Sequence, residues 1–537
     1  EDGTDETWDM PEHSITFDPP TISDDCTSEQ RAQHQALIEQ YAHLFGPAPP
    51  GGAKLTPFDI QLKYKPKPMS ARVVSGKVKQ ELEEDLQERI DAGWMRRGGV
   101  GEFASPLVAV LQPNKPKRRA AGDYRRINDA TEPSNYPTKN ASAIFQRVKG
   151  HRFFAKLDLL RGYYQLPLTQ RASEILALRA MDGIYEPITL PYGPKNGPAE
   201  FQRRISEEVL QELEGNGIES FLDDLLVSAA TFEEYIKLLR QLFERLDEFD
   251  LRLKGQKCLL GSKEAEFLGL VINGDGVAHL DSRKQAILGI AKPTNKAKLR
   301  TMLGMAGFMR PHIEKYAMIV KPLTDLQGKN AIFKWTEAQD RAFENLKTAI
   351  YNAPVLKFLD YDREIFVRTD ASKEGVGAVL YQLSDERKEM PVAYLSKKFS
   401  PQESRWSTYE QETYGVFYAI LKWQQFLLGH QFTVETDHKN MLSLFKAEAP
   451  KLVRMRLRLQ EFDFIIKHVP GKLNVVPDAL SRLQNTDPRF IAYAAKTLSQ
   501  HADTGTDLPF FINSPVFLGL NNRKQKTAHA LDSTVSQ

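Results

Sequence analysis

Two adjacent carboxylates stand inside an apolar stretch of this chain. Asp223 and Asp224 are flanked on both sides by the apolar residues of the run 221–227. An ionised carboxylate taken out of water costs several kcal/mol unless it is paired or bound to a metal. The simplest counter-charge for two neighbouring carboxylates is a divalent cation. The alternative is a tight turn between two buried strands, with both Asp side chains in water at its tip.

The length and composition limit the class of protein. A chain of 537 residues exceeds one hydrophobic core and predicts about three or four domains. With 41% hydrophobic and 26% charged residues, it is typical of a soluble globular protein. It contains no apolar run of about 18 residues and no secretory pattern at its beginning, so we expect neither a membrane span nor a signal peptide. The two cysteines, Cys26 and Cys258, exclude a disulfide framework and indicate a reducing compartment.

The charge is unevenly distributed along the chain. Residues 1–25 hold nine acidic residues and no Lys or Arg, which predicts a disordered or loosely docked tail. Because the net charge of the whole chain is +2, the remainder carries +11. The remainder could therefore bind a polyanion through local basic patches.

The first half of the chain alternates between helical and extended patterns. Apolar spacing predicts helices over residues 28–45 and 75–92, then a strand over 105–111. A basic turn follows at 114–119, with Lys115, Lys117, Arg118 and Arg119. A charge run of this kind is usually a solvated face, and that alternative stays open for the turn taken alone.

A third carboxylate makes a metal site more plausible than a plain turn. Residues 152–159 alternate like a strand and place Asp158 near its end. Two cations about 3.5 to 4 Å apart can clamp the attacking and leaving oxygens of a phosphoryl transfer. Asp158 could hold such ions together with Asp223 and Asp224, although it lies 65 residues before Asp223.

Five motifs in this order resemble the reverse transcriptase of gypsy-type LTR retrotransposons. The resemblance, with the nuclease motifs below, covers residues 66–485. The motifs begin with Asp123-Tyr124-Arg125 and Lys156-Leu157-Asp158-Leu159, and continue with Leu190-Pro191-Tyr192-Gly193, Phe221-Leu222-Asp223-Asp224 and Phe267-Leu268-Gly269. It implies a right-hand polymerase of fingers, palm and thumb. Phe221 and Tyr192 depart from the family, which usually has Tyr at the first position and Phe or Gln at the second.

The resemblance also implies roles for single residues. Asp158, Asp223 and Asp224 would be the palm carboxylates that bind two Mg²⁺ ions, with Mn²⁺ as an alternative. Tyr163 would be the steric gate against a ribose 2′-OH, unless it is an ordinary core aromatic. The triphosphate would be gripped by Arg119, whose donor fork suits that role, and by either Lys115 or Lys117. Tyr192 would line the nucleotide pocket.

The segment after the palm is expected to be mostly helical. Residues 267–276, with Asn273-Gly274 as the turn signal, predict a hairpin that matches the family's primer grip at Phe267, Leu268 and Gly269. Helices in pieces are expected from 281 to about 327, broken near Pro293 and Pro311, and another over 336–351. By the resemblance, this basic helical region is the thumb.

A second set of acids follows in the last third of the chain. Strand patterns deliver Asp370 and Asp437, and a capping box opens a helix from 407 to about 428 in which Glu410 is the cap partner and Glu412 faces a sheet. Asp478 stands in the first turn of a further helix, where an acid commonly stabilises the helix dipole. In the resemblance, Asp370, Glu412, Asp437 and Asp478 are instead the four metal-binding acids of RNase H. His468 matches the histidine of its mobile loop, and Lys451, Arg454 and Arg458 would meet the hybrid's phosphates.

The fold class expected is therefore α+β and α/β multidomain, a right-hand polymerase followed by an RNase H-like mixed-sheet domain. The expected domains are an acidic tail and lead-in helix (1–65), fingers and palm (66–280), thumb (281–360), RNase H (361–485) and a polar extension (486–537). Asp503-Thr504-Gly505 in that extension spells an aspartic-protease triplet, but its polar neighbours favour a chance turn.

The function expected is RNA- and DNA-templated DNA synthesis together with hydrolysis of the RNA strand of hybrids. Its partners would be an RNA template, a DNA primer, the RNA/DNA hybrid and deoxynucleoside triphosphates, with no membrane. The resemblance also implies an intracellular setting, a cytoplasmic virus-like particle, and dimerisation on substrate as in some relatives. The alternative is a decayed nucleic-acid-binding protein of retroelement origin, against which the seven intact acids argue.

Overall fold

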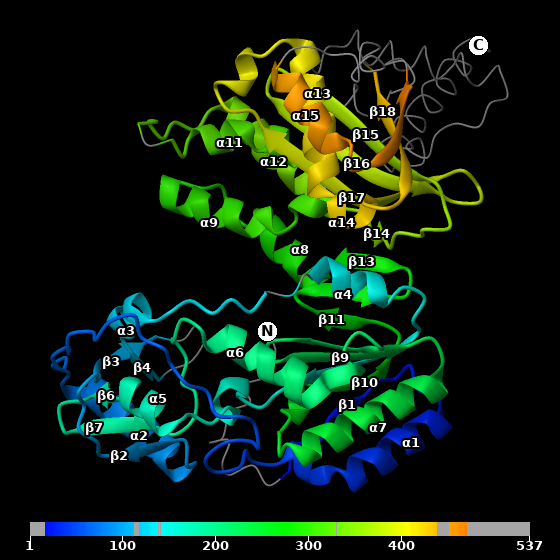
Figure 1. The fold of residues 1–537 in the computed structure, drawn as a ribbon. Coiled ribbons are helices and arrows are strands. Elements are labelled where there is room, and N and C mark those ends of the chain that lie inside the picture. The colour runs from blue at the N-terminus through cyan, green and yellow to red at the C-terminus, as the bar shows by residue number, and fades with distance from the viewer. Residues whose placement is uncertain are drawn as a thin grey trace, which may run out of the picture. The chain divides into compact units, whose positions relative to one another are not determined.

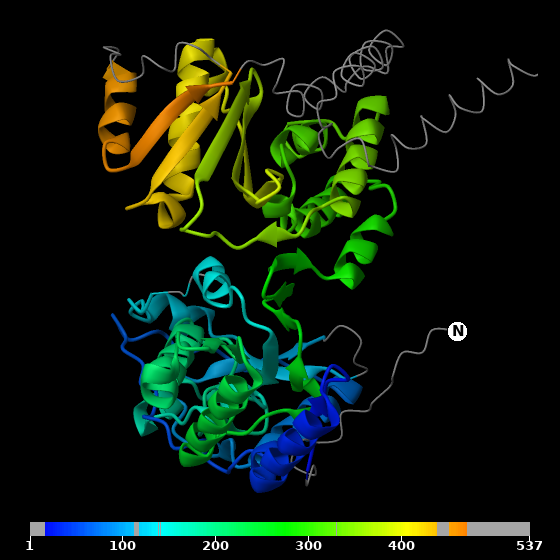
Figure 2. The same cartoon turned by 90° about the vertical axis from the view of Figure 1, so that its right-hand side faces the viewer.

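The computed structural model describes residues 17–111, 117–137, 139, 141–328, 330–437 and 450–469. The chain divides into two compact units, residues 1–283 and 284–537, and each is described by itself. Figures 1 and 2 show both units as ribbons. Within the described residues, every helix is too short or too polar to cross a membrane.

The first unit is built on a mixed five-stranded sheet. Its strand order is β1-β10-β5-β9-β8, and β1 is parallel to β10 while the other neighbours are antiparallel. The strands are β1 (Thr21–Ile22), β10 (Leu259–Ser262), β5 (Phe153–Asp158), β9 (Asp224–Ala229) and β8 (Ile218–Phe221). Helices α1 (Ser28–Gln40) and α7 (Phe232–Glu248) pack side by side on this sheet (Figure 1).

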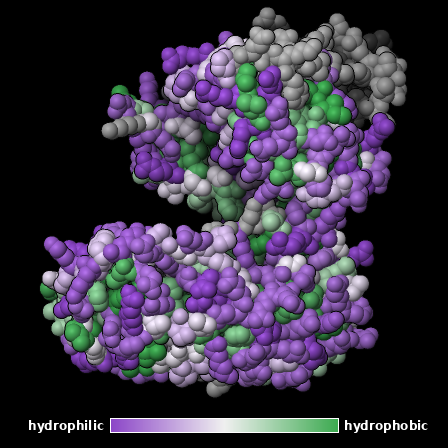
Figure 3. Space-filling view, in the orientation of Figure 1, coloured by the Kyte–Doolittle hydropathy of each residue, from purple (hydrophilic) through white to green (hydrophobic). Residues whose placement is uncertain are grey.

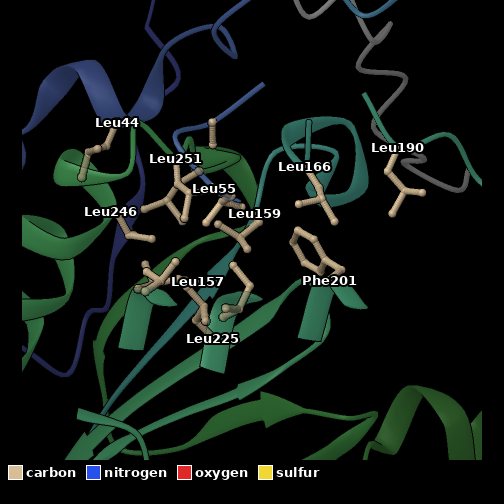
Figure 4. Close-up of a cluster of buried hydrophobic side chains, with 14 of the residues drawn as sticks. Leu44, Leu55, Leu157, Leu159, Leu166, Leu190, Phe201, Leu225, Leu246 and Leu251 are labelled. Carbon is tan, nitrogen blue, oxygen red and sulfur yellow. The ribbon is translucent and has the colours of Figure 1, made fainter. Parts of the chain in front are cut away.

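Part of the core of this unit lies between the sheet and those helices. Leu157 and Leu225 project from neighbouring strands toward Leu246 and Leu251, and all four are fully buried (Figure 4). Each buried leucine contributes about 1.5 to 3 kcal/mol by leaving water. The core therefore holds β5 and β9 in place, the two strands whose ends carry Asp158 and Asp224.

The expected helix over 28–45 is two elements, so that prediction was wrong only from Tyr41 onward. Helix α1 ends at Gln40, and a 3₁₀ turn, η2 (Ala42–Phe45), follows Tyr41. The tighter turn directs Leu44 and Phe45 into the core, where both are fully buried.

A second sheet of the first unit has the order β2-β7-β6-β3-β4. Its strands are β2 (Met95–Arg97), β7 (Ile184–Pro187), β6 (Leu178–Arg179), β3 (Ser105–Val110) and β4 (Arg119–Gly122). Helix α2 (Gly76–Asp91) confirms the helix expected over 75–92, and it packs against β4 and β2. The shorter helical elements are α3 (Arg125–Ala130), α4 (Ala141–Arg147), η3 (Gly162–Gln165), α5 (Gln170–Ile175), α6 (Gly197–Arg204), η4 (Ile205–Leu210), η5 (Gln211–Leu213) and η6 (Gly255–Lys257).

The predicted hairpin over 267–276 is a three-stranded meander, so both its extent and its turn were wrong. Its strands are β11 (Ala265–Phe267), β12 (Leu270–Asn273) and β13 (Gly276–His279). The second turn is Gly274-Asp275 rather than Asn273-Gly274, because Asn273 still pairs with Gly276. The Asn273 side chain accepts hydrogen bonds from the amides of Asp275 and Gly276, at 3.0 and 3.1 Å, and closes that turn.

The second unit begins with short helices, as the sequence predicts. Helix α8 (Asp281–Leu288) spans the boundary between the units. It is followed by α9 (Lys296–Gly307), η7 (Arg310–His312), α10 (Tyr316–Ile319), α11 (Lys321–Asp325) and α12 (Glu337–Tyr351). These helices bury a cluster of their own that includes Leu299, Met302 and Phe343.

The rest of the second unit is a five-stranded mixed sheet with helices packed on one face. Its order is β17-β16-β15-β18-β19, antiparallel among the first three strands and parallel from β15 to β19. The elements are β14 (Leu356–Lys357), β15 (Ile365–Ser372), β16 (Gly375–Leu383), β17 (Glu389–Lys398), η8 (Glu403–Arg405), α13 (Thr408–Lys422), α14 (Gln424–Leu427), β18 (Gln431–Thr436), α15 (Pro450–Leu459) and β19 (Asp463–His468). Figure 1 shows α13 and α15 side by side over the strands.

The helix expected over 407–428 ends early. Ser407 and Glu410 form the predicted capping box, but α13 stops at Lys422 and a separate turn, α14, follows Trp423. The break directs Phe426 and Leu427 into the core of the sheet, where both are buried.

Candidate active sites

The paired Asp residues lie at a two-residue turn between buried strands, Asp223 in the turn and Asp224 at the start of β9. Phe221 and Asp224 face each other across the β8–β9 hairpin, and Leu222-Asp223 forms its loop. Leu222 has a φ of 54°, and its amide donates a 2.7 Å hydrogen bond to the Gln202 side chain. The two hypotheses for this stretch, a tight turn and a metal site, are thus compatible, because the turn positions the acids.

The neighbouring strand brings the third acid to the same place. Asp158 ends β5 and is the cross-strand partner of Asp224. The Lys257 ammonium lies 3.4 Å from Asp158 Oδ2 and supplies one positive charge that the sequence patterns did not single out. The three predicted palm carboxylates therefore meet at one end of β5 and β9.

This gathering of acids changes their protonation. Burial, helped by the charges of Asp158 and Asp224, raises the pKa of Asp223 to about 6. Burial likewise raises the pKa of Asp224. Gly162 gives the Asp223 carboxylate its space, because a Cβ at Gly162 would lie 2.4 Å from Asp223 Oδ1.

A cation fits this arrangement. Asp223 Oδ1 is buried without a hydrogen-bond partner among the described residues, next to two further carboxylates. A hard divalent ion prefers such oxygen ligands. In the described part of the chain, however, no three acidic, His or Cys side chains already converge on one metal position.

The residues predicted to bind the nucleotide lie together beside these acids. The Tyr163 ring, on η3, is 5.1 Å from the Tyr192 ring and 5.3 Å from the Phe201 ring. Burial and the Asp223 charge raise the pKa of Tyr163 to about 12. The Arg119 guanidinium lies 4.2 Å over the Tyr192 ring. Asn128 anchors the loop of Tyr192 by donating a 3.0 Å hydrogen bond to the Gly193 carbonyl.

Of the two lysines predicted to contact the triphosphate, the structure describes only Lys117. Lys117 forms a 2.8 Å ion pair with Glu84 of α2, which raises the pKa of the ammonium. Lys115 lies outside the described residues. A triphosphate role for Lys117 would require it to leave Glu84.

The predicted primer grip is the first turn of the β11–β12–β13 meander. Phe267 is fully buried, and Leu268 and Gly269 form the loop with φ values of 54° and 73°. Arg283 donates a 3.0 Å hydrogen bond to the Gly269 carbonyl. The motif is thus a tight turn that a side-chain hydrogen bond holds.

The second acidic centre lies at the middle of the second unit's sheet. Asp370 is in β15 but does not end it, because the strand continues to Ser372 and pairs with β16. Glu412 on α13 is buried, and burial together with the charges of Asp437 and Asp370 raises its pKa to about 8. Its Oε2 atom has no hydrogen-bond partner among the described residues. A divalent cation therefore fits here as well.

The remaining predicted residues of this centre have mixed outcomes. Asp437 directly follows β18, as predicted. His468 is the last residue of β19 rather than a loop residue, and its Nε2–H donates a 3.0 Å hydrogen bond to the Asp437 carbonyl. Asp478 lies outside the described residues.

A lysine that sequence patterns missed reaches this centre. Lys315, in the left-handed region with a φ of 52°, places Nζ 2.5 Å from Asp370 Oδ2 and is only 6% exposed. Gly377, opposite Asp370 on β16, leaves room for its stem, since a Cβ there would lie 3.0 Å from Lys315 Cγ. Ala317 anchors the segment through a 3.0 Å hydrogen bond from its amide to Ser396 Oγ. No local pattern marks Lys315, because the contact spans 55 residues.

The basic side of α15 is partly engaged within the unit. Lys451 forms a 2.8 Å ion pair with Glu410 and lies 4.0 Å over the Trp406 ring. Arg454 and Arg458 are exposed. The surface seen in Figure 3 is mainly hydrophilic, with apolar residues scattered singly or in small groups.

Two segments of the chain match known family models. Residues 111–272 match the family model described as reverse transcriptase (RNA-dependent DNA polymerase), and residues 335–434 match the RNase H-like domain found in reverse transcriptase. The chain carries a reverse transcriptase domain and an RNase H-like domain. The segment matched by the first model contains Asp158, Asp223 and Asp224, the predicted palm acids, and the segment matched by the second contains Asp370 and Glu412.

The relatives of this chain are transposon polyproteins. It is 32% identical over 413 residues to the Retrovirus-related Pol polyprotein from transposon 297 of Drosophila melanogaster, covering 75% of this chain and 38% of that protein. It is 29% identical over 416 residues to the Transposon Tf2-3 polyprotein of Schizosaccharomyces pombe, covering 76% of this chain and 31% of that protein. The chain thus spans about a third of the length of these relatives.

Solved structures confirm the fold class. The foamy viral protease-reverse transcriptase in complex with RNA/DNA hybrid matches with a TM-score of 0.72 at 22% identity, over 83% of this chain and 61% of that one. The same protein in complex with dsDNA matches with a TM-score of 0.71 at 22% identity, over 83% of this chain and 94% of that one. The fold is therefore a polymerase followed by an RNase H-like domain. The exact domain bounds given above and the roles of single residues stay predictions.

Proposed function

We propose that this chain copies RNA and DNA templates into DNA and hydrolyses the RNA strand of RNA/DNA hybrids. One feature shared by the two units carries the proposal. Each unit buries a carboxylate oxygen that lacks a hydrogen-bond partner in the described residues, Asp223 Oδ1 in the first and Glu412 Oε2 in the second, beside further acids. Such oxygens are suited to divalent cations, and the family models matched at both places support the assignment.

In the polymerase centre, Asp158 and Asp223 would hold two Mg²⁺ or Mn²⁺ ions, with Asp224 beside them. Bound ions of this kind polarise a phosphoryl group and stabilise its leaving oxygen. Arg119 binds the triphosphate of the incoming nucleotide with its donor fork. Tyr163, packed between Tyr192 and Phe201, fills the space that a ribose 2′-OH would need and so selects deoxynucleotides.

In the nuclease centre, Asp370, Glu412 and Asp437 would hold the ions, and Asp478 is their proposed fourth partner. His468 is held at the Asp437 carbonyl, beside these proposed ion ligands. Exposed Arg454 and Arg458 would contact the phosphates of the hybrid, setting its position but not its sequence. The ligands named for the solved foamy viral structures, an RNA/DNA hybrid and dsDNA, agree with these substrates.

Two matched substitutions test the two-centre proposal. Asp223→Asn is expected to abolish extension of a DNA primer on an RNA template while hybrid cleavage continues. Asp370→Asn is expected to do the reverse. Neutralisation of exposed acids on α1 and α12, Glu29→Gln and Glu344→Gln, provides controls that retain both activities. Loss of both activities from either active-site change would contradict the proposal.

The same assay addresses the decayed-element alternative. A wild-type chain that binds the hybrid but neither extends nor cleaves it would favour that alternative over the enzyme. A cytoplasmic virus-like particle and dimerisation on substrate stay predictions from the resemblance.

A further inference from the structure

A buried tyrosine contacts the arginine that we assign to the triphosphate. Tyr164 is 3% exposed, and its hydroxyl oxygen accepts a 3.3 Å hydrogen bond from Arg119 Nη2. On its other side, Arg119 lies over the Tyr192 ring. The two aromatic side chains therefore restrict the guanidinium from two directions, edge and face. A guanidinium has five N–H donors, so the bond to Tyr164 leaves others for a ligand.

The Tyr164 ring is itself held by an indole. The Trp94 and Tyr164 rings stack with centroids 5.0 Å apart and an interplanar angle of 21°. The Arg161 guanidinium lies 5.0 Å over the Trp94 ring. Trp94 is 4% exposed, and its Nε1 has no hydrogen-bond partner among the described residues, so stacking rather than hydrogen bonding accounts for its place.

The backbone beside Arg119 is clamped separately. Ala120 on the edge strand β4 donates a 2.7 Å hydrogen bond from its amide to Asp85 Oδ2, and its carbonyl accepts a 2.6 Å bond from Arg89. Asp85 and Arg89 form a 2.5 Å ion pair one turn apart on α2. Because β4 has a strand neighbour only on the β3 side in the described sheet, these side chains take the place of the missing strand. The stem of Arg119 thus starts from a fixed point.

We propose that Tyr164 is a positioning residue for the incoming nucleotide: its hydroxyl, held by the Trp94 stack, orients the Arg119 guanidinium toward the triphosphate. The inference rests on the proposed polymerase function. An arginine that is held in place before binding loses less side-chain entropy when the nucleotide arrives. Removing the hydroxyl should therefore weaken nucleotide binding and leave the chemical step almost unchanged.

The test is Tyr164→Phe in the full chain, with single-turnover primer extension over a range of dNTP concentrations. The dissociation constant of the dNTP is expected to rise about fivefold, while the maximal rate changes less than about twofold. Tyr185→Phe is the matched control, because Tyr185 is a buried residue of β7, in the same sheet as Arg119, and its hydroxyl donates a 2.6 Å hydrogen bond to Asp182. The control should leave the dNTP dissociation constant unchanged.

A double-mutant cycle with Arg119→Ala separates positioning from a general loss of structure. If Tyr164 acts through Arg119, adding Tyr164→Phe to Arg119→Ala should cause no further weakening of dNTP binding. Equal weakening in both backgrounds, or an unchanged dissociation constant in Tyr164→Phe alone, would overturn the inference. A wild-type chain without primer extension would instead refute the proposed function, so the two failures are distinguishable.

Discussion

Neutralising Asp223 should stabilise the metal-free protein at alkaline pH. In the folded chain the pKa of Asp223 is raised from 3.8 to about 6, mainly by burial. An unfolded chain ionises this group near pH 4, so the folded state pays an increasing penalty as the pH rises from about 4 to above 6. A shift of about two pKa units corresponds to at most about 3 kcal/mol. Because Asp223 remains partly exposed, we expect about 1 to 3 kcal/mol.

The comparison is Asp223→Asn against the wild-type chain in EDTA at pH 8 and at pH 4. The variant should be more stable by that amount at pH 8, and the difference should fall below about 1 kcal/mol at pH 4. Urea-dependent hydrogen exchange of peptides from β5 and β9 measures the stability locally, which avoids treating a two-unit chain as two-state.

Adding Mg²⁺ should have the opposite effect on the difference in stability between the two proteins. It should stabilise the wild-type chain at pH 8 more than the variant, because the ion binds the folded carboxylates. Glu29→Gln, an exposed neutralisation on α1, controls for the change in net charge. An Asp223→Asn stability that is equal to wild type at pH 8, or a difference that does not vary with pH, would refute the reasoning.

Three further measurements test other parts of the two centres. Glu412, whose pKa is raised to about 8, should be largely protonated at pH 7, so Mg²⁺ binding should release about one proton. Calorimetry in buffers of different ionisation enthalpy should detect this proton release in wild type but not in Glu412→Gln. Tyr163→Ala should admit ribonucleotides during primer extension, and unchanged sugar selectivity would contradict the gate assignment. Lys315→Met should destabilise the second unit by about 1 to 3 kcal/mol in EDTA, because Asp370 loses its partner. Added Mg²⁺ should increase the stability of this variant more than that of wild type. Equal melting of the two proteins in EDTA would count against a stabilising role of the pair.

Local sequence patterns were sufficient for the elements that carry the acids. The alternation around Asp158 predicts β5, and the paired acids predict the turn between β8 and β9. The capping box at Ser407 separates the roles of Glu410 and Glu412. Each of these features depends on residues a few positions apart, so backbone sterics and hydrogen bonding determine them without knowledge of the fold.

Element ends were predicted less well, for a physical reason. The helix expected through Phe45 breaks at Tyr41, and the helix expected through residue 428 breaks at Trp423. In both cases the break in the helix allows the following residues to be buried against neighbouring elements. Tertiary packing therefore overrides a local pattern that would have continued.

By itself, the sequence predicted the two acidic centres, their order and the family that their motifs resemble, because those signals lie in short contiguous motifs. Only the tertiary structure revealed the Lys315–Asp370 pair, the Lys117–Glu84 pair and the stack of Trp94 on Tyr164 beside Arg119. These contacts join residues 33 to 70 positions apart. No period or spacing encodes such a pair, since it forms only when folding brings separate elements within reach of one another.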